Sequence, residues 1–177
     1  FSGVDKRYHA GNDTLIMRDL SREQVVMRLS GDDLEIGIKE EGKAFSGLSD
    51  VLTIKNWKNP NNRIETIRFT DGDITAQNLT GYLTFGDEGQ NFTWTESAAD
   101  LSLGSGNDTI TTGNYGDTVI TGSGANKVFT AGGNDSIHVS AGASGSIVQG
   151  GVGNDSYSYG RAGGRVSLFD NYSEWDG

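Results

Sequence analysis

Three stretches decide the fold: Leu103–Thr111 (LGSGNDTIT), Thr130–His138 (TAGGNDSIH) and Gly150–Ser158 (GGVGNDSYS). Each is nine residues long, with glycine at the fourth place, aspartate at the sixth and an apolar or aromatic residue at the eighth. Weaker copies of the same nonapeptide lie between and after them, at 112–120, 121–129, 141–149 and 159–167. A short period that recurs in this way is typical of a solenoid, in which each repeat packs on its neighbours.

An apolar ladder extends beyond the glycine-rich repeats. The ladder keeps a spacing of nine residues, apart from one two-residue slip at Val139–Ser140. We expect its members to be Leu83, Phe92, Leu101, Ile110, Val119, Val128, Ile137, Val148, Tyr157 and Val166. Each repeat then consists of a six-residue turn and a three-residue strand, whose middle residue points inward while its two neighbours point outward. Glycines supply the positive φ angles and the close backbone approach that tight turns need. Two nonapeptides would close one turn of the coil, so that alternate strands stack into two parallel sheets.

The acidic residues of residues 103–167 occupy a single place in the repeat. This segment has only four of them, Asp108, Asp117, Asp135 and Asp155, and each stands at the sixth place. A solvated surface would scatter its carboxylates over several places. Carboxylates beside turn carbonyls, without cysteine or a histidine in register, suit a hard cation such as Ca²⁺. Asparagine–aspartate turns that close a coil without metal are the alternative.

The repeat resembles the G-G-x-G-x-D-x-U-x nonapeptide of RTX proteins, the haemolysin-type calcium-binding repeats of secreted bacterial toxins, proteases, lipases and adhesins. The resemblance covers about 65 residues. It implies an all-β chain with a right-handed parallel β-roll over 103–167, in which Ca²⁺ lies between turns on the same side. It also implies type I secretion and an extracellular or bacterial cell-surface location.

The resemblance further implies a ligand set for each ion. The sixth-place carboxylates of two stacked turns would bind it, together with carbonyls of places one and three from one turn and of places two and four from the other. The candidate ligands are Asp108, Thr112, Asn114, Asp117, Thr130, Ala131, Gly132, Gly133, Asp135, Gly151, Gly153 and Asp155.

The two edges of the roll are expected to differ. One edge stacks Asp117, Asp135 and Asp155, so we expect about two Ca²⁺ ions there. The other edge is expected to stack Asp108, Asn126, Ser146 and Gly164. Because that edge lacks paired carboxylates, it would hold at best a weak site between Asp108 and Asn126.

Residues 1–80 read as a β-rich capping domain, a small antiparallel sheet or sandwich. Short β-branched segments separated by Gly, Asp and Asn turns predict strands at 25–29, 34–39, 51–55 and 64–69, and Ser21–Gln24 predicts one helical turn. The stretches 32–38 (DDLEIGI) and 50–74 (DVLTIKNWKNPNNRIETIRFTDGDI) are similar to the flanking domain that follows many RTX arrays. Residues 81–102 are expected to form metal-free entry coils, in which Phe85 and Trp94 cover the first turn. Residues 168–177 would form an exit segment.

Composition limits both the core and the partners. The chain has 177 residues, 34% of them hydrophobic, no cysteine and a formal charge of −10. A small core predicts that calcium supplies part of the folding free energy, so that the roll is disordered at cytosolic calcium and folds outside the cell. The charge disfavours nucleic acid, and no apolar run is long enough for a membrane span. Because the chain starts at Phe1, we expect it to be a piece of a longer protein.

The sequence predicts a non-catalytic module. It has no Gly-x-Ser-x-Gly elbow, phosphate-binding loop or His-Glu-x-x-His motif. Asp71–Asp73 resembles the start of an EF-hand, but Ala76 and Tyr82 stand where that loop needs Gly and Glu, which favours a simple turn. His9 and His138 are expected to be surface residues.

The expected function is calcium-driven folding that stabilises neighbouring domains of a toxin or adhesin, with a host-surface ligand as a possible partner. The alternatives are the calcium-binding module of a secreted protease, lipase or epimerase, and an adhesin segment that binds a ligand.

Overall fold

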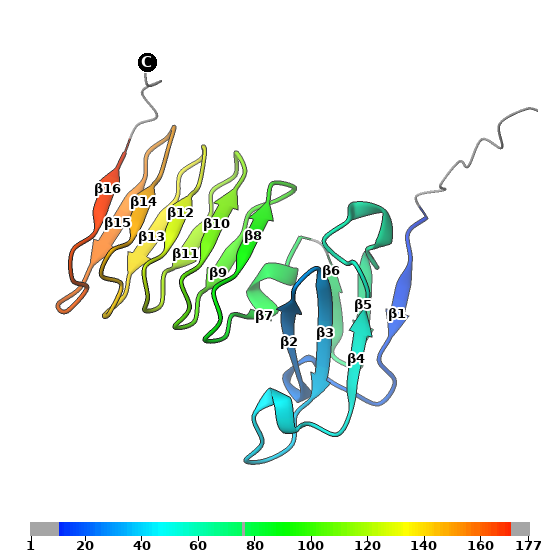
Figure 1. Cartoon of the computed structure of the whole chain (residues 1–177). Helices are drawn as coiled ribbons and strands as arrows, with labels where there is room; N and C mark the ends of the chain where they lie inside the picture. The colour runs from blue at the N-terminus through cyan, green and yellow to red at the C-terminus, as the bar shows by residue number, and fades with distance from the viewer. Residues whose placement is uncertain (1–10, 76, 171–177) are drawn as a thin grey trace, which may run out of the picture.

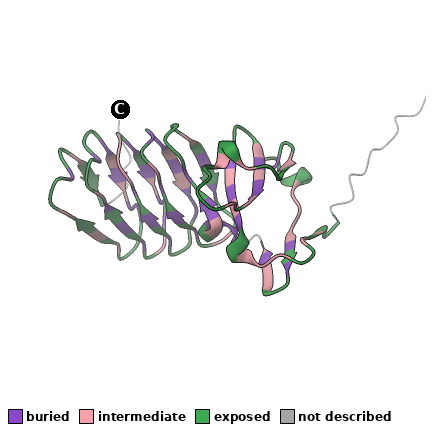
Figure 2. Cartoon of the chain, turned by 90° about the horizontal axis from the view of Figure 1, so that it is seen from below, coloured by how far each residue is buried: buried purple, intermediate pink, exposed green. Residues whose placement is uncertain are grey.

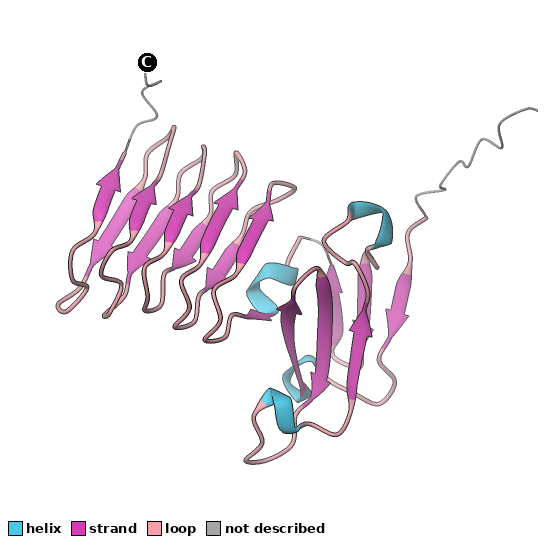
Figure 3. Cartoon of the chain, viewed as in Figure 1, coloured by secondary structure: helices cyan, strands magenta, loops and turns pink. Residues whose placement is uncertain are grey.

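The computed structural model describes residues 11–75 and 77–170 and is an all-β structure with two parts (Figure 1). An N-terminal part of two small sheets is followed by a parallel β-solenoid of about four turns. Figure 3 shows that the helical segments are short and lie in the N-terminal part and at the junction. They are the 3-10 turns η1 (Arg22–Gln24), η2 (Phe45–Gly47), η3 (Pro60–Asn62) and η4 (Leu79–Tyr82). Among the described residues, no helix has the length and apolar character that a membrane crossing requires.

The solenoid consists of two stacked parallel sheets, as the repeat predicts. Every neighbouring pair of strands within them is parallel. The five-stranded sheet contains β8 (Asn91–Trp94), β10 (Thr109–Thr112), β12 (Lys127–Phe129), β14 (Ile147–Gln149) and β16 (Ser167–Phe169). The four-stranded sheet contains β9 (Asp100–Ser102), β11 (Thr118–Ile120), β13 (Ser136–Val139) and β15 (Ser156–Tyr159).

The apolar ladder fills the space between these sheets. In one sheet Ile110 lies opposite both Phe92 and Val128, and in the other Val119 lies opposite both Leu101 and Ile137. Most ladder side chains are no more than 1% exposed. Figure 2 shows buried segments alternating with more exposed ones along the solenoid strands. His138 is one of these exposed residues, whereas His9 lies outside the described residues.

The predicted register is wrong at the C-terminal end of the ladder. Leu168 of β16, and not Val166, lies opposite Val148. The turn before β16 therefore contains two extra residues, and Val166 takes the sixth place that the sequence assigned to Gly164. Because residues two apart in a strand face the same side, an apolar pattern does not distinguish Val166 from Leu168. Glycine-rich backbone with positive φ at Ala162 and Gly164 accommodates the insertion.

The first member of the ladder, Leu83, is buried as predicted, but its strand pairs outside the solenoid. Leu83 lies in β7 (Leu83–Thr84), which pairs in parallel with β2 (Val25–Ser30) of the N-terminal part instead of a solenoid strand. This sheet has the order β4 (Val51–Ile54), β3 (Asp33–Ile38), β2 and β7, and β4, β3 and β2 are antiparallel. The other small sheet contains β1 (Thr14–Ile16), β5 (Thr66–Phe69) and β6 (Gly72–Thr75). Both sheets of the N-terminal part are therefore mainly antiparallel, and each has one parallel strand at an edge.

Two local predictions in the N-terminal part are confirmed. Ser21 begins η1 with a capping box, in which its backbone N–H donates to the Gln24 side chain (2.8 Å). Asp71 lies in the tight turn between β5 and β6, where its carboxylate accepts hydrogen bonds from Arg22. This segment is a hairpin turn and not an EF-hand.

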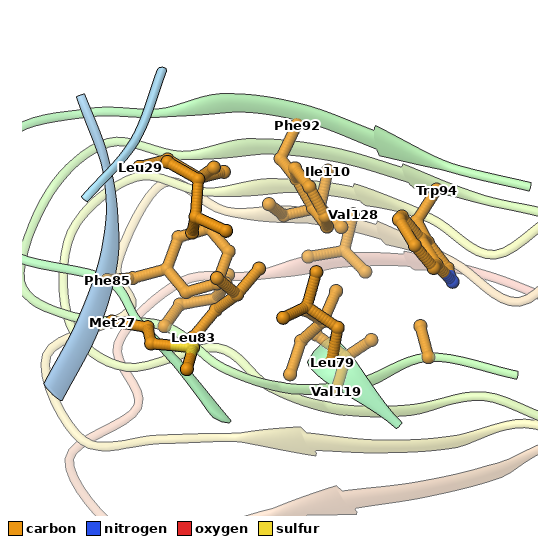
Figure 4. Close-up of a cluster of buried hydrophobic side chains, with 14 of the residues drawn as sticks. Met27, Leu29, Leu79, Leu83, Phe85, Phe92, Trp94, Ile110, Val119 and Val128 are labelled. Carbon is orange, nitrogen blue, oxygen red and sulfur yellow. The ribbon is translucent and has the colours of Figure 1, made fainter. Parts of the chain in front are cut away.

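A single hydrophobic core joins the two parts. Met27, Leu29 and Leu83 of the N-terminal part pack towards Phe85 and Phe92, beyond which the solenoid ladder continues (Figure 4). The rings of Phe85 and Phe92 meet edge to face with centroids 5.7 Å apart. The N-terminal part thus covers the first turn of the solenoid, which would otherwise expose its apolar interior.

An aromatic stack with a cation above it also connects the parts. Trp57 follows β4 and stacks on Trp94 of β8, with ring centroids 6.2 Å apart and an interplanar angle of 6°. The Arg63 guanidinium lies 5.0 Å from the Trp57 ring centroid and 5.1 Å from that of Trp94, and it pairs with Glu96. The Lys58 ammonium adds a hydrogen bond to the Asn91 carbonyl (2.9 Å).

Ala131 offers a test of the turn geometry. It stands at the second place of its repeat with φ +57°, whereas Gly122 and Gly151 hold positive φ at the same place in other turns. A side chain in this region costs roughly 1 kcal/mol. Ala131→Gly should therefore raise the free energy of unfolding by about 0.5–1 kcal/mol in a denaturant titration. A loss of stability would contradict the backbone conformation of this turn.

Candidate metal centre

The sixth-place side chains stack along the two edges of the solenoid. On one edge the backbone N–H of Asp117 donates to Oδ1 of Asp135 (2.8 Å), and that of Asp135 donates to Oδ1 of Asp155 (3.0 Å). The row starts at Ala99, whose N–H donates to Oδ1 of Asp117 (2.7 Å). The structure therefore brings together the three carboxylates that the sequence assigned to one edge.

The opposite edge has the same ladder of bonds but different side chains. The N–H of Gln90 donates to Oδ1 of Asp108 (2.8 Å), and the N–H of Asp108 donates to Oδ1 of Asn126 (2.8 Å). The N–H of Asn126 then donates to the Ser146 hydroxyl (2.9 Å). Asp108 is the only carboxylate in this part of the row, so no acidic pair forms between it and Asn126.

The second carboxylate oxygens have few partners. Oδ2 is buried without a hydrogen-bond donor in Asp108, Asp135 and Asp155. In Asp117 the Thr112 hydroxyl donates to Oδ2. Asp108 and Asp117 are each 1% exposed and Asp135 is 2% exposed. A buried acceptor with no donor costs about 1–3 kcal/mol, and a charged one costs more. Among the described residues, nothing in the chain supplies a partner to Oδ2 of Asp108, Asp135 or Asp155.

The raised pKa values of the buried aspartates also indicate that positive charge is missing from the turns. Burial raises the pKa of Asp108, Asp117 and Asp135, because removal from water disfavours the charged carboxylate. The neighbouring carboxylate raises the pKa further for Asp117 and Asp135. Among the described residues no ion pair includes these three aspartates. A bound cation would supply the missing positive charge.

The turns that carry the candidate carbonyls lie directly on one another. The N–H of Val152 donates to the Ala131 carbonyl (2.8 Å), and the N–H of Gly133 donates to the Val152 carbonyl (2.9 Å). A Cβ atom on Gly153 would lie 1.6 Å from the Gly133 carbonyl oxygen, and one on Gly151 would lie 2.0 Å from that of Ala131. Glycine is thus required where these two turns meet. The same stacking holds Gly132 against Gly113, next to Thr112 and Asn114 in the preceding turn of the edge.

The donor set fits calcium. The candidate ligand atoms are all oxygens, from carboxylates, carbonyls and hydroxyls, and Ca²⁺ takes six to eight such ligands. In the part of the chain that the structure describes, no three His, Cys, Asp or Glu side chains gather at one point. An ion here would therefore rely on two carboxylates together with main-chain oxygens, as in the predicted ligand set.

Sequence reasoning missed the buried hydroxyl groups of the turns. Thr112, Thr121 and Thr130 occupy the first place of three successive repeats and are at most 1% exposed; Thr112 and Thr130 lie on the edge of Asp117 and Asp135, and Thr121 lies on the other. The Thr130 hydroxyl donates to the Gly150 carbonyl (2.9 Å), while that of Thr112 donates to Asp117. The recurrence of threonine at this place was the available signal.

Tyr157 places a further oxygen atom near the row, although the sequence pattern assigned it only an apolar role. Its hydroxyl is buried beside Asp155: a Cβ on Gly150 would lie 2.0 Å from the hydroxyl and 2.4 Å from Oδ2 of Asp155. Burial raises the pKa of Tyr157, and the nearby carboxylates of Asp155 and Asp170 raise it further, so the phenol stays protonated. The last carboxylate of the row thus has a neutral hydroxyl next to it.

Comparison with known proteins finds a family match within the N-terminal part. Residues 33–74 match the sequence model of the haemolysin-type calcium binding protein related domain. The matched segment runs from β3 to β6 and contains Trp57, which stacks against the solenoid. No curated protein and no solved structure matches the chain.

Proposed function

We propose that this chain, which its matching flank and its parallel β-solenoid identify as RTX-like, is a calcium-binding module of a secreted bacterial toxin or adhesin that folds on calcium after export. The observation that carries this proposal is the row Asp117, Asp135 and Asp155. Its carboxylates are stacked by backbone hydrogen bonds, and Oδ2 of Asp135 and of Asp155 is buried without a donor.

About two ions would bind this edge, one in each gap of the row. Asp117 and Asp135 would hold the first, with the carbonyls of Thr112, Asn114, Ala131 and Gly133. Asp135 and Asp155 would hold the second, with the carbonyls of Thr130, Gly132, Gly151 and Gly153. Calcium supplies positive charge to the buried oxygens, and the chain supplies the stacked turns that position them.

Folding would then depend on the compartment. An ion that binds only the folded state stabilises it by about 2.7 kcal/mol at a hundredfold excess over its Kd, and extracellular calcium modules have Kd values of about 10⁻⁴–10⁻³ M. The solenoid would therefore remain unfolded before export and fold outside. As a non-catalytic module it would stiffen neighbouring domains of a longer chain and hold them in position, and a host-surface ligand is the further partner we propose.

Circular dichroism with and without calcium tests this function. We expect the β-sheet signal of the solenoid to appear as calcium rises to millimolar concentrations and to disappear in excess chelator. Magnesium at the same concentration should have little effect, because it demands octahedral geometry and gives up its water reluctantly. A spectrum that is unchanged by chelator would refute the proposal.

A further inference from the structure

Asn126 differs from the sixth-place aspartates in having a side-chain hydrogen-bond donor, its NH₂ group. It is fully buried, and its Nδ2 donates to the carbonyls of Thr121 (2.7 Å), Ser123 (3.0 Å) and Gly124 (3.4 Å). Oδ1 of Asn126 accepts the N–H of Asp108, which identifies the other side-chain atom as nitrogen. The side-chain amide of Asn126 thus supplies hydrogen bonds to the carbonyl groups of its own turn.

The second terminal atom of the sixth-place side chain, Oδ2 in aspartate or Nδ2 in asparagine, differs between the turns. In Asp117 this atom is an oxygen that accepts a hydrogen bond from the Thr112 hydroxyl, and in Asp135 it is an oxygen with no donor. In the turn of Asn126 the atom is an NH₂ group that contacts the carbonyls of the first, third and fourth places. These carbonyls belong to the class of main-chain oxygens that the ligand set assigns to a cation elsewhere.

We propose that the Asn126 amide is a built-in substitute for a metal ion, which makes the turn 121–126 independent of calcium. The partial positive charge of the NH₂ group lies against carbonyl oxygens where other turns need a cation. The same charge would repel a cation from this turn. Ser146, the next residue of the row, continues it with a neutral hydroxyl, which itself donates to the Gly124 carbonyl (3.2 Å). One edge of the solenoid would thus be held in part by amide and hydroxyl groups and the other by ions.

This inference deepens the proposed calcium-binding function. Only its prediction of the number of bound ions rests on that function. A solenoid with a calcium-independent turn in its middle would keep residual order along that edge when calcium is low. Calcium would then complete the fold from one side only. The chain would need fewer ions than a coil with carboxylates on both edges.

Asn126→Asp tests the inference, because it retains Oδ1 and exchanges only the NH₂ group for an oxygen. At the lowest calcium concentration that keeps the wild type folded, we expect the variant to have a Tm lower by at least about 5 °C, since a buried donor is replaced by a buried unpaired charge. In saturating calcium, native mass spectrometry should show one more bound ion than in the wild type, held between Asp108 and residue 126. An unchanged ion count would overturn the substitution of amide for metal.

Asn107→Asp is the matched control. Asn107 lies in the stacked turn on the same edge, is exposed, and accepts the N–H of Ala125 through Oδ1 (2.8 Å), a bond that a carboxylate preserves. It carries the same change of charge, so equal Tm values for the two variants would overturn the inference. If chelator unfolds all three proteins, Asn126→Asp should need more calcium than Asn107→Asp at the folding midpoint, and equal midpoints would count against it.

A wild type that binds no calcium at all would refute the proposed function. The comparison of Asn126→Asp with Asn107→Asp in chelator would still decide whether the amide holds its turn.

Discussion

Asp135→Ala is expected to weaken calcium binding by more than about tenfold, the largest loss from any single aspartate change. Asp135 lies in the middle of its row, so its carboxylate faces both proposed ion positions. The substitution also removes the acceptor of the Asp117 N–H, a bond of 2.8 Å in a buried turn. An unsatisfied buried donor alone costs about 1–3 kcal/mol, which is a factor of roughly 5 to 150 in an equilibrium constant. Isothermal titration calorimetry with calcium measures the effect.

Two further variants separate the roles of this carboxylate. Asp135→Asn keeps an oxygen for the Asp117 N–H and loses the negative charge, so it should lose calcium affinity while losing less stability in chelator than Asp135→Ala. Asp108→Ala removes an equally buried carboxylate from the other edge. If Asp108→Ala reduced calcium affinity as much as Asp135→Ala, the difference between the edges would be wrong.

Gly122→Ala is expected to destabilise the solenoid by about 3 kcal/mol or more. The effect should not depend on calcium, because the proposed ions lie on the other edge. Gly122 has φ +63°, and a Cβ atom there would lie 2.0 Å from the Gly104 carbonyl oxygen and 2.4 Å from that of Leu103. These contacts are to backbone atoms of the stacked turn, which cannot rotate away as a side chain would. The turns would have to separate, and the strands beside them would lose their hydrogen bonds.

Gly31→Ala is the control for backbone strain alone. Gly31 has φ +61° in the turn between β2 and β3, and a Cβ there would meet no atom within 4 Å. We therefore expect a loss of only about 1 kcal/mol. Urea titrations in saturating calcium compare the two variants. Equal losses would show that the turns of the solenoid are not packed as closely as described.

Much of this fold was predictable because a nonapeptide repeat is a local signal that recurs. The spacing of Ile110, Val128 and Val148 predicts which residues lie opposite one another, since each repeat adds one strand of the same length. The sixth-place acids likewise predict which carboxylates share an edge. In the N-terminal part, the capping box at Ser21 and the turn at Asp71 depend on residues only a few positions apart.

The ends of the ladder could not be predicted in the same way. Leu83 fits the spacing, yet β7 pairs with β2, because a strand at the start of the solenoid can pair with any available edge. Val166 and Leu168 both fit an inward position, and only the parallel register with Val148 distinguishes them. The stack of Trp57 on Trp94 joins residues 37 positions apart, which no local period records.

The amino-acid sequence by itself determined the two-sheet coil, its two unequal edges and the oxygen character of its turns, because these follow from which residue types recur at each place. Only the tertiary structure decided which atoms of those turns have a partner: the hydroxyl of Thr112 on Asp117, the amide of Asn126 on three carbonyls, and the solitary oxygen of Asp135. Hydrogen-bond satisfaction depends on distances and directions between stacked turns, and a list of residues contains neither.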